Sequence, residues 1–319
     1  MAQPSIHVEV LLTETELAEQ FAAAWRQRFL DEKFFYWFPL SVLAWLELCR
    51  GNQPYRNYSR SQELVRGHAA EIAGKDGGGS IELVGLGAGQ GDKDLLLLES
   101  WRQSGRQARY LSVDASLSLL ELGLAAAAGA GFPARGLKAD LASAATFQAL
   151  AGSAGEPRLY AVLGNTLGVI HPLGLLDALG SLLRPQDRLL VDGEVFDPQG
   201  TLAGYDNPVN RRFAFSPLAA VGLEEGRDGT LVFESGRDEG EEGLHVLSKH
   251  FRPARRLDIV VAGRRIELAA GEKVAMHGSY KYSLDAFPRI LRRGGFRLLE
   301  QYRSQDARFL MALAAPGAA

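Results

Sequence analysis

The sequence has little of what several common classes of protein require. It contains one cysteine among 319 residues, Cys49, so an internal disulfide is excluded and most cysteine–zinc sites are excluded with it. The net charge of −3 gives no reason to expect a surface that binds nucleic acid. No run approaches about 18 uncharged apolar residues, and no basic segment followed by an apolar one opens the chain. We therefore expect a cytoplasmic protein that has no membrane partner.

Metal-binding and nucleophilic patterns are missing as well. The chain has six histidines: His7, His68, His171, His245, His250 and His277. Their spacing matches no metal motif, so we expect no metal site. No nucleophile–base triad is visible in the sequence either. Cys49 lies in an apolar stretch, where a buried structural thiol is expected rather than a nucleophile.

The most informative segment is a glycine loop at residues 81–91, Ile-Glu-Leu-Val-Gly-Leu-Gly-Ala-Gly-Gln-Gly. Its glycines stand at alternate positions: Gly85, Gly87, Gly89 and Gly91. A strand that runs into bare backbone and then into a helix brings a nucleotide-like ligand against the main chain. The alternative is an ordinary glycine-rich turn of an α/β protein.

The spacing of the glycines in the loop limits which class of ligand it can bind. The dinucleotide fingerprint Gly-x-Gly-x-x-Gly fails in both registers, because its third glycine would be Gln90 or Asp92. A phosphate-binding P-loop needs Gly-Lys-Ser/Thr, whereas here Asp92 would repel polyphosphate. The better match is the first loop of S-adenosylmethionine methyltransferases, whose ligand carries a sulfonium and no phosphate. A dehydrogenase remains an alternative that Gln90 weakens.

The pattern along the chain predicts an α/β fold from residue 81 onward. Strands are expected at 81–86, 109–113, 134–138, 159–164 and 187–193. Helices are expected at 92–104, 116–128, 144–151 and 173–183. This alternation is typical of a doubly wound parallel sheet. Two late strands, at 297–303 and 308–315, are separated by so few residues that they must pair antiparallel. A mostly parallel sheet with a late antiparallel strand is the Rossmann-like layout of class I methyltransferases.

Two further regions are expected to build an extra α+β substrate lobe. We expect residues 1–76 to form its helical part and residues 197–282 its inserted antiparallel strands, while 77–196 and 283–319 form the cofactor-binding domain. A capping box of Thr13 and Glu16 opens the first helix. The other expected features are a helical face of Leu17, Phe21, Trp25 and Phe29, helices capped by Ser41 and Ser283, a helix from 62 to 73, strands at 229–234, 244–251 and 256–268, and a hairpin turn at 263–264.

Candidate cofactor residues follow the strands of the predicted sheet. Asp114 ends the second strand, where a carboxylate accepts both ribose hydroxyl hydrogens of a nucleoside. Asp140 ends the third strand and could accept the adenine amino group. Either acid could instead cap the helix that follows it. Gly164 and Asn165 end the fourth strand, where small and polar residues line the space between donor and acceptor.

These motifs resemble those of the histidine-specific S-adenosylmethionine methyltransferases, a family typified by the enzyme that trimethylates the histidine α-amino group in ergothioneine biosynthesis. The resemblance covers most of the chain. It rests on Tyr-Ser-Arg-Ser-Gln-Glu at 58–63, His-Ala-Ala-Glu-Ile at 68–72, the glycine loop, Val-Asp at 113–114, Gly-Asn-Thr-Leu-Gly at 164–168, Ala-Gly-Tyr-Asp at 203–206 and Ser-Tyr-Lys-Tyr at 279–282. It implies S-adenosylmethionine as cofactor and a small amine or amino-acid-like molecule as methyl acceptor.

The resemblance carries site residues over unevenly. Gly85, Gly87, Gly89 and Asp114 match the family's cofactor positions, and Lys93 is expected to reach the cofactor carboxylate. Tyr205 matches a tyrosine that grips the substrate carboxylate, and Ser279 matches a serine that contacts the imidazole. The loop tyrosines Tyr55 and Tyr58 either join this acceptor set or pack the lobe.

Two positions depart from the family pattern. The asparagine that holds the substrate amino acid is here Val169, and the glutamate that pairs with imidazole is here His277. Each change removes a hydrogen-bonding partner and is expected to cost histidine binding on the order of 1–3 kcal/mol. We therefore expect a methyltransferase that acts on nitrogen of a small amine and uses free histidine poorly. Transfer of the cofactor's aminocarboxypropyl arm, or a degenerate member that binds without turnover, are the alternatives.

Overall fold

The computed structural model describes residues 6–50, 54–75, 79–152 and 155–317. The chain divides into two compact units, each built from segments distant in sequence. Unit 1 comprises residues 1–11, 57–195 and 281–319, and unit 2 comprises residues 12–56 and 196–280. The expected domain boundary at 76–77 falls outside the described residues, and the helix that precedes it groups with unit 1.

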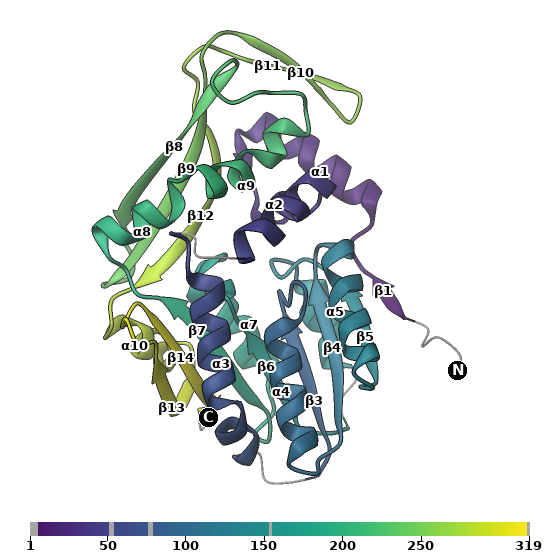
Figure 1. Ribbon diagram of the computed structural model, residues 1–319. Helices are drawn as coiled ribbons and strands as arrows, with labels where there is room; N and C mark the ends of the chain where they lie inside the picture. Colours follow the sequence, from purple (N-terminus) through teal and green to yellow (C-terminus); the bar gives the residue numbers. More distant parts are fainter. Residues whose placement is uncertain (1–5, 51–53, 76–78, 153–154, 318–319) are drawn as a thin grey trace. The chain divides into compact units, whose positions relative to one another are not determined.

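Unit 1 is an eight-stranded sheet with helices on both faces (Figure 1). Its strands are β1 (Val8–Val10), β3 (Ile81–Leu86), β4 (Ala108–Asp114), β5 (Ala134–Lys138), β6 (Arg158–Val162), β7 (Arg188–Glu194), β13 (Phe296–Arg303) and β14 (Phe309–Pro316). Its helices are α3 (Asn57–Gly74), α4 (Asp92–Gln103), α5 (Leu117–Gly129), α6 (Ala144–Ala151), η2 (Thr166–Gly168), α7 (Pro172–Leu182) and α10 (Ala286–Arg293).

The strand order is β1-β5-β4-β3-β6-β7-β14-β13. The pairs from β1 to β7 are parallel, whereas β14 runs antiparallel to both β7 and β13. The mostly parallel sheet with a late antiparallel strand is therefore confirmed. All the carboxyl ends of β3, β4, β6 and β7 lie at one edge, where the candidate cofactor residues follow them.

Unit 2 combines aromatic-rich helices with two small β-sheets, in which one strand pair is parallel. Its elements are α1 (Glu14–Gln27), β2 (Phe29–Leu30), η1 (Glu32–Phe35), α2 (Pro39–Cys49), α8 (Pro198–Tyr205), α9 (Pro208–Ala219), β8 (Gly229–Arg237), β9 (Leu244–Pro253), β10 (Leu257–Val261), β11 (Arg264–Leu268) and most of β12 (Val274–Tyr282). Strands β2, β12, β9 and β8 form one sheet, and β10 and β11 form a separate hairpin. The hairpin turn lies one residue earlier than expected, at Ala262 and Gly263, where both φ angles are positive as a type I′ turn requires.

Four expectations about helix ends were wrong, each because backbone geometry or a distant contact decides the local structure. Helix α1 ends at Gln27 because Arg28 is left-handed, so Phe29 leaves the helical face and is 44% exposed. Pro39 begins α2 after Phe38, and Ser41 is buried inside that helix. The third helix was expected to begin at residue 62, but α3 begins at Asn57. Ser283 was expected to cap the last helix, but Asp285 is the residue that precedes α10. Cys49 ends α2 half-buried rather than fully buried.

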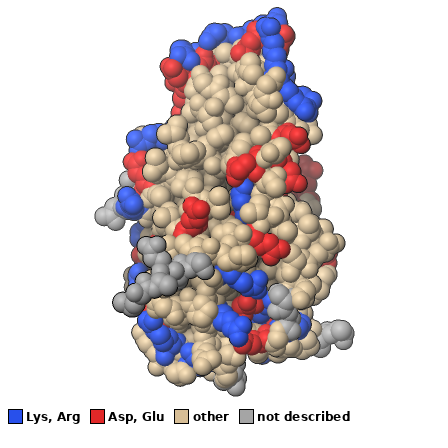
Figure 2. Space-filling model, turned by 90° about the vertical axis from the view of Figure 1, so that its right-hand side faces the viewer, with Lys and Arg blue, Asp and Glu red and all other residues tan. Residues whose placement is uncertain are grey.

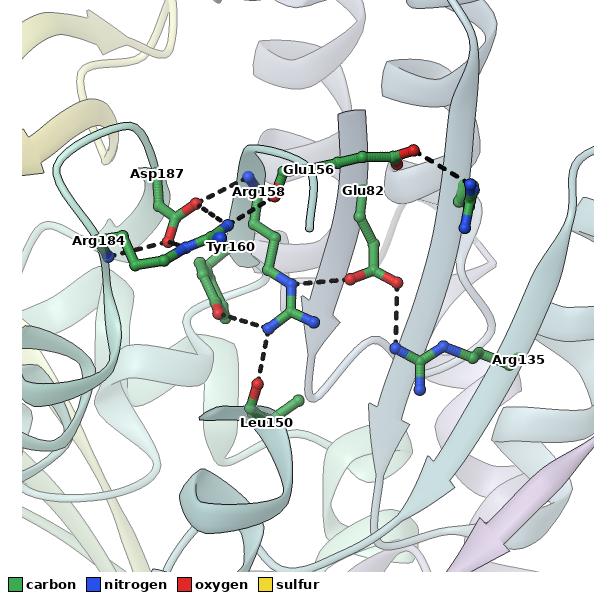
Figure 3. Close-up of polar contacts among 9 residues, drawn as sticks. Glu82, Arg135, Leu150, Glu156, Arg158, Tyr160, Arg184 and Asp187 are labelled. Carbon is green, nitrogen blue, oxygen red and sulfur yellow. Dashed lines mark hydrogen bonds and ion pairs between the residues drawn. The ribbon is translucent and has the colours of Figure 1, made fainter. Parts of the chain in front are cut away.

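A buried arginine joins the amino ends of the central strands of unit 1 (Figure 3). The Arg158 side chain is 1% exposed, and its Nε donates to Glu82 at 2.7 Å. Its Nη1 donates to the backbone oxygen of Leu150 at 2.7 Å and to the Tyr160 hydroxyl at 3.1 Å. Arg135 reaches the other oxygen of Glu82 at 3.1 Å, but that side chain is 40% exposed. The buried guanidinium therefore makes three hydrogen bonds, to Glu82, Leu150 and Tyr160, at the sheet edge opposite the glycine loop.

Candidate active site

The glycine loop links β3 to α4, and its glycines serve different purposes. A Cβ at Gly85 would lie 2.3 Å from Asp94 Oδ2, and one at Gly87 would lie 2.7 Å from Thr166 Cγ2. These two glycines allow neighbouring side chains to approach the backbone closely. Gly89 has a φ of +58°, and an added Cβ would meet nothing within 4 Å. Among Gly85, Gly87 and Gly89, only Gly89 therefore combines a positive φ angle with open space beside the backbone.

Asp114 ends β4 directly beside the loop. Its Oδ2 accepts a hydrogen bond from the Gly89 amide, and its Oδ1 accepts one from the Ser116 amide, both at 2.9 Å. Ser116, not Asp114, is the N-cap of α5. Burial raises the pKa of Asp114, and the bonds from Ser116 and Gly89 oppose that rise. A carboxylate offers about four acceptor sites, so these two bonds leave capacity for ribose hydroxyls.

A polar cluster formed by Tyr58, Gln90, Asp92 and Lys93 covers the start of α4. The Tyr58 hydroxyl donates to Asp92 and accepts from Gln90 Nε2 at 2.8 Å. Lys93 is 9% exposed, and its Nζ lies 4.5 Å from the centroid of the Tyr58 ring. The structure thus places Tyr58 with the glycine loop in unit 1, whereas the sequence had grouped it with the acceptor residues.

The loop after β6 is held by an acid that the sequence reasoning missed. Gly164 and Asn165 both have positive φ angles, +82° and +65°. Asp192 of β7 accepts from the amides of Gly164 and Asn165 at 3.0 and 2.8 Å, and from the Ser61 hydroxyl. Burial raises the pKa of Asp192, and the bond from Ser61 opposes the rise. Asp192 therefore fixes a strained turn at the carboxyl edge of the sheet.

Asp140 follows β5 and is half-buried. Its Oδ1 accepts from the Ala142 amide at 2.8 Å, which makes a turn within the loop. The residue before α6 is Ser143, so Asp140 does not cap that helix. Its role toward adenine stays a prediction.

Asp94, which packs against the glycine loop, should make the stability of the protein depend on pH. Burial raises the pKa of Asp94 to about 6, although Tyr110 donates to its Oδ2 at 2.6 Å. The folded state therefore holds this proton more tightly than the unfolded state. Its ionisation cost is absent below about pH 4 and complete above about pH 6. The Asp94→Asn variant should gain up to about 3 kcal/mol of stability relative to wild type across that range. Urea unfolding at several pH values measures the difference in free energy of unfolding between the variant and wild type. A difference that does not change with pH would contradict the raised pKa of Asp94.

The acceptor candidates of unit 2 form a second group. The Tyr205 hydroxyl at the end of α8 lies 3.5 Å from Ser279 Oγ of β12. The rings of Tyr55 and Tyr205 pack edge to face, with centroids 5.3 Å apart. The structure therefore brings Tyr205, Ser279 and Tyr55 together.

A charged cluster that the sequence did not reveal surrounds His277. Glu32 Oε2 lies 3.9 Å from His277 Nε2 and 3.9 Å from Lys249 Nζ. Glu32 also accepts a hydrogen bond from Tyr36, whose pKa burial raises and the Glu32 charge raises further. Lys249 Nζ lies 3.8 Å from the centroid of the Phe35 ring. An acid is therefore present beside His277, but it comes from η1.

Val169 belongs to unit 1, whereas the other acceptor candidates of this group belong to unit 2. It follows η2 in unit 1 and is half-buried. The other residues missed by sequence reasoning are Asn57, Ser61, Asp192, Glu194 and Lys281. The alternation of two acids in Val-Asp-Gly-Glu, at the carboxyl end of a buried strand, was the signal that could have found the pair Asp192 and Glu194.

The described residues also bear on other functional classes. No group of three or more potential metal ligands gathers there. No helix in that part of the chain combines the length and apolar character needed to cross a bilayer. Figure 2 shows Lys and Arg interspersed with Asp and Glu on the face that it presents, with no broad field of positive charge.

Comparisons with known proteins identify the family. A family model described as histidine-specific methyltransferase, SAM-dependent, matches residues 19–316. The chain is 27% identical over 263 residues to a histidine N-alpha-methyltransferase of Mycolicibacterium smegmatis, covering 79% of this chain and 80% of that one. It is 25% identical, with the same coverage, to the protein of that name from Mycobacterium tuberculosis. A solved S-adenosylmethionine-dependent methyltransferase from Clostridium acetobutylicum is 10% identical and has a TM-score of 0.46, covering 83% of this chain and 96% of that one.

Proposed function

Because the chain belongs to the histidine-specific, S-adenosylmethionine-dependent methyltransferase family, we propose that it methylates nitrogen of a small amine or amino-acid-derived acceptor other than free histidine. S-adenosylmethionine supplies a methyl group that its sulfonium already activates. The protein must hold a neutral nitrogen in line with that carbon and exclude water. Neither requirement calls for a nucleophilic triad or a metal.

The described residues of unit 1 fit the cofactor. Gly89 offers open backbone, and the Asp114 carboxylate is fixed beside it by the Gly89 amide. Asp114 would hold the ribose hydroxyls. Lys93 lies next to the same loop and supplies the positive charge that a carboxylate of the cofactor requires. Gly164 and Asn165 would border the reacting end. These assignments of single residues are proposals.

The acceptor proposal rests on one observation, the replacement of a carboxylate by His277 two residues before Ser279. An imidazole acceptor would meet another imidazole there instead of an acid. Glu32 lies 3.9 Å from His277 Nε2, and Lys249 Nζ lies 3.9 Å from the same carboxylate and 3.8 Å from the centroid of the Phe35 ring. The protein already combines a carboxylate and an aromatic ring with the ammonium group of Lys249 here, and the same chemistry suits the ammonium group of an amine acceptor. If the acceptor arrives as an ammonium ion, His277 is suited to take its proton, because imidazole accepts protons readily near neutral pH.

Incubation of the purified protein with S-adenosylmethionine and a panel of amines and amino acids tests the proposal by mass spectrometry. We expect a methylated amine together with S-adenosylhomocysteine, and a kcat/KM for free histidine at least about tenfold lower than for the best amine. Histidine as the best acceptor would overturn the proposal. Methylthioadenosine as coproduct would instead indicate aminocarboxypropyl transfer. Cofactor binding without any product would indicate a degenerate member.

Restoring the family's polar residues should move the specificity toward histidine. The double variant Val169→Asn/His277→Glu regains an amide and a carboxylate, each worth on the order of 1–3 kcal/mol. Its kcat/KM for histidine should rise at least about tenfold over wild type. The single variants are expected to give smaller increases. Leu43→Asn, an exposed change on α2, is the control. An unchanged kcat/KM for histidine in the double variant would contradict the assignment of these positions.

A further inference from the structure

The chain passes between the two units four times, and three of these junctions end at neighbouring residues of unit 1. It enters unit 1 at Asn57, leaves after Val195 and enters again at Lys281. Asn57 is the first residue of α3, Glu194 is the last residue of β7, and Lys281 lies in the last part of β12. The three residues are 1%, 5% and 0% exposed.

One carboxylate connects these three junctions. Glu194 Oε2 accepts a hydrogen bond from Asn57 Nδ2 at 2.6 Å and pairs with Lys281 Nζ at 3.0 Å. A backbone bridge between Val195 and Tyr282 joins two of the same junctions. A buried ion pair with a third hydrogen-bonding partner holds its geometry tightly, because breaking it would leave a charge buried without compensation.

The same residues continue into the loop after β6. The Glu194 amide donates to Asn165 Oδ1 at 2.9 Å. Asp192 lies two residues before Glu194 on the same face of β7, and it accepts from the Asn165 amide at 2.8 Å and from Ser61. Ser61 is four residues after Asn57 on α3, so both project from one face of that helix. The junctions and the candidate cofactor loop therefore share a continuous set of hydrogen bonds.

We propose that Glu194 is a positioning residue that clamps three of the four junctions and couples them to the cofactor loop through Asn165. When cofactor binds against the loop after β6, the chain segments at these junctions then become less mobile. The role of Asn165 in this coupling rests on the cofactor site proposed above, whereas the clamp itself does not.

Hydrogen–deuterium exchange with and without S-adenosylhomocysteine tests the clamp. In wild type, saturating S-adenosylhomocysteine should slow exchange at residues 55–58, 195–197 and 279–282. In Glu194→Gln/Lys281→Met, which removes both buried charges together, exchange at those segments should be at least about tenfold faster. Ligand should then slow exchange only around the glycine loop. The amides of β3 and β4 should keep wild-type protection, which distinguishes loss of the clamp from loss of the fold.

The control is Lys75→Met, at the residue that follows α3. It removes a half-exposed ion pair with Glu300 at the far end of α3 and should leave the junction exchange unchanged. Titration with S-adenosylhomocysteine shows first that each protein binds ligand, so failure of the cofactor proposal is seen separately. Wild-type exchange at the junctions in the double variant, or ligand-dependent slowing that persists there, would overturn the clamp.

Discussion

Replacement of Asp114 by alanine is expected to weaken the binding of S-adenosylhomocysteine by on the order of 100-fold or more. The two ribose hydroxyls would each donate to a carboxylate that is already oriented by the Gly89 and Ser116 amides. Hydrogen bonds to a charged group contribute roughly 1.5–3 kcal/mol each, and tenfold in affinity corresponds to about 1.4 kcal/mol. Isothermal titration of the purified variant measures the loss directly.

Two further proteins separate the loss of a ligand contact from damage to the loop. Asp114→Asn keeps one oxygen for the Gly89 amide and should melt near the wild-type temperature while still binding weakly. Asp258→Ala changes an exposed acid of the β10–β11 hairpin and should bind as wild type does. Wild-type affinity in Asp114→Ala would place the nucleoside elsewhere in the protein.

The central sheet could be predicted because its signals are local. Strand β3 spans the predicted residues 81–86, since an apolar run ends there in glycines that only a tight turn needs. The late antiparallel pair followed from the short connection between β13 and β14. In contrast, β12 passes through the polar motif at 279–282, and nothing local marks it as a strand. Its pairing with β2 depends on residues about 240 positions away in the chain.

The residues of the candidate site also fall into those that local sequence predicts and those that it does not. The glycine loop and Asp114 could be recognised because their spacing along the chain reflects one strand–turn–helix unit. The roles of Asp192 and Glu194 could not, because an acid in a buried strand gains meaning only from partners far along the sequence, Ser61 and Lys281. The first turn of α3 was missed for that reason too. Its polar residues are typical of a loop, and only the structure shows that Asn57 and Ser61 bind Glu194 and Asp192 of β7.

The buried arginine at the amino ends of the strands leads to the largest expected loss of stability. Arg158→Met removes the buried partner of the Glu82 carboxylate, which is itself 12% exposed, and the donor to the carbonyl of the buried Leu150. Removing one member of a buried ion pair costs about 3–5 kcal/mol, because the remaining charge loses compensation, and Glu82 would keep only its ion pair with the exposed Arg135. Urea unfolding should therefore show a loss of this size. The network is remote from the glycine loop, so the affinity for S-adenosylhomocysteine should stay near wild type wherever the variant is folded.

Arg135→Met is the matched control, because it removes an arginine from the same carboxylate. The Arg135 side chain is 40% exposed and its ion pair with Glu82 is open to water, so the loss should stay below about 1 kcal/mol. The double variant Glu82→Leu/Arg158→Met removes both buried charges and should recover part of the stability lost in Arg158→Met. Equal losses in Arg158→Met and Arg135→Met would contradict this account, because burial would then not determine what the ion pair contributes.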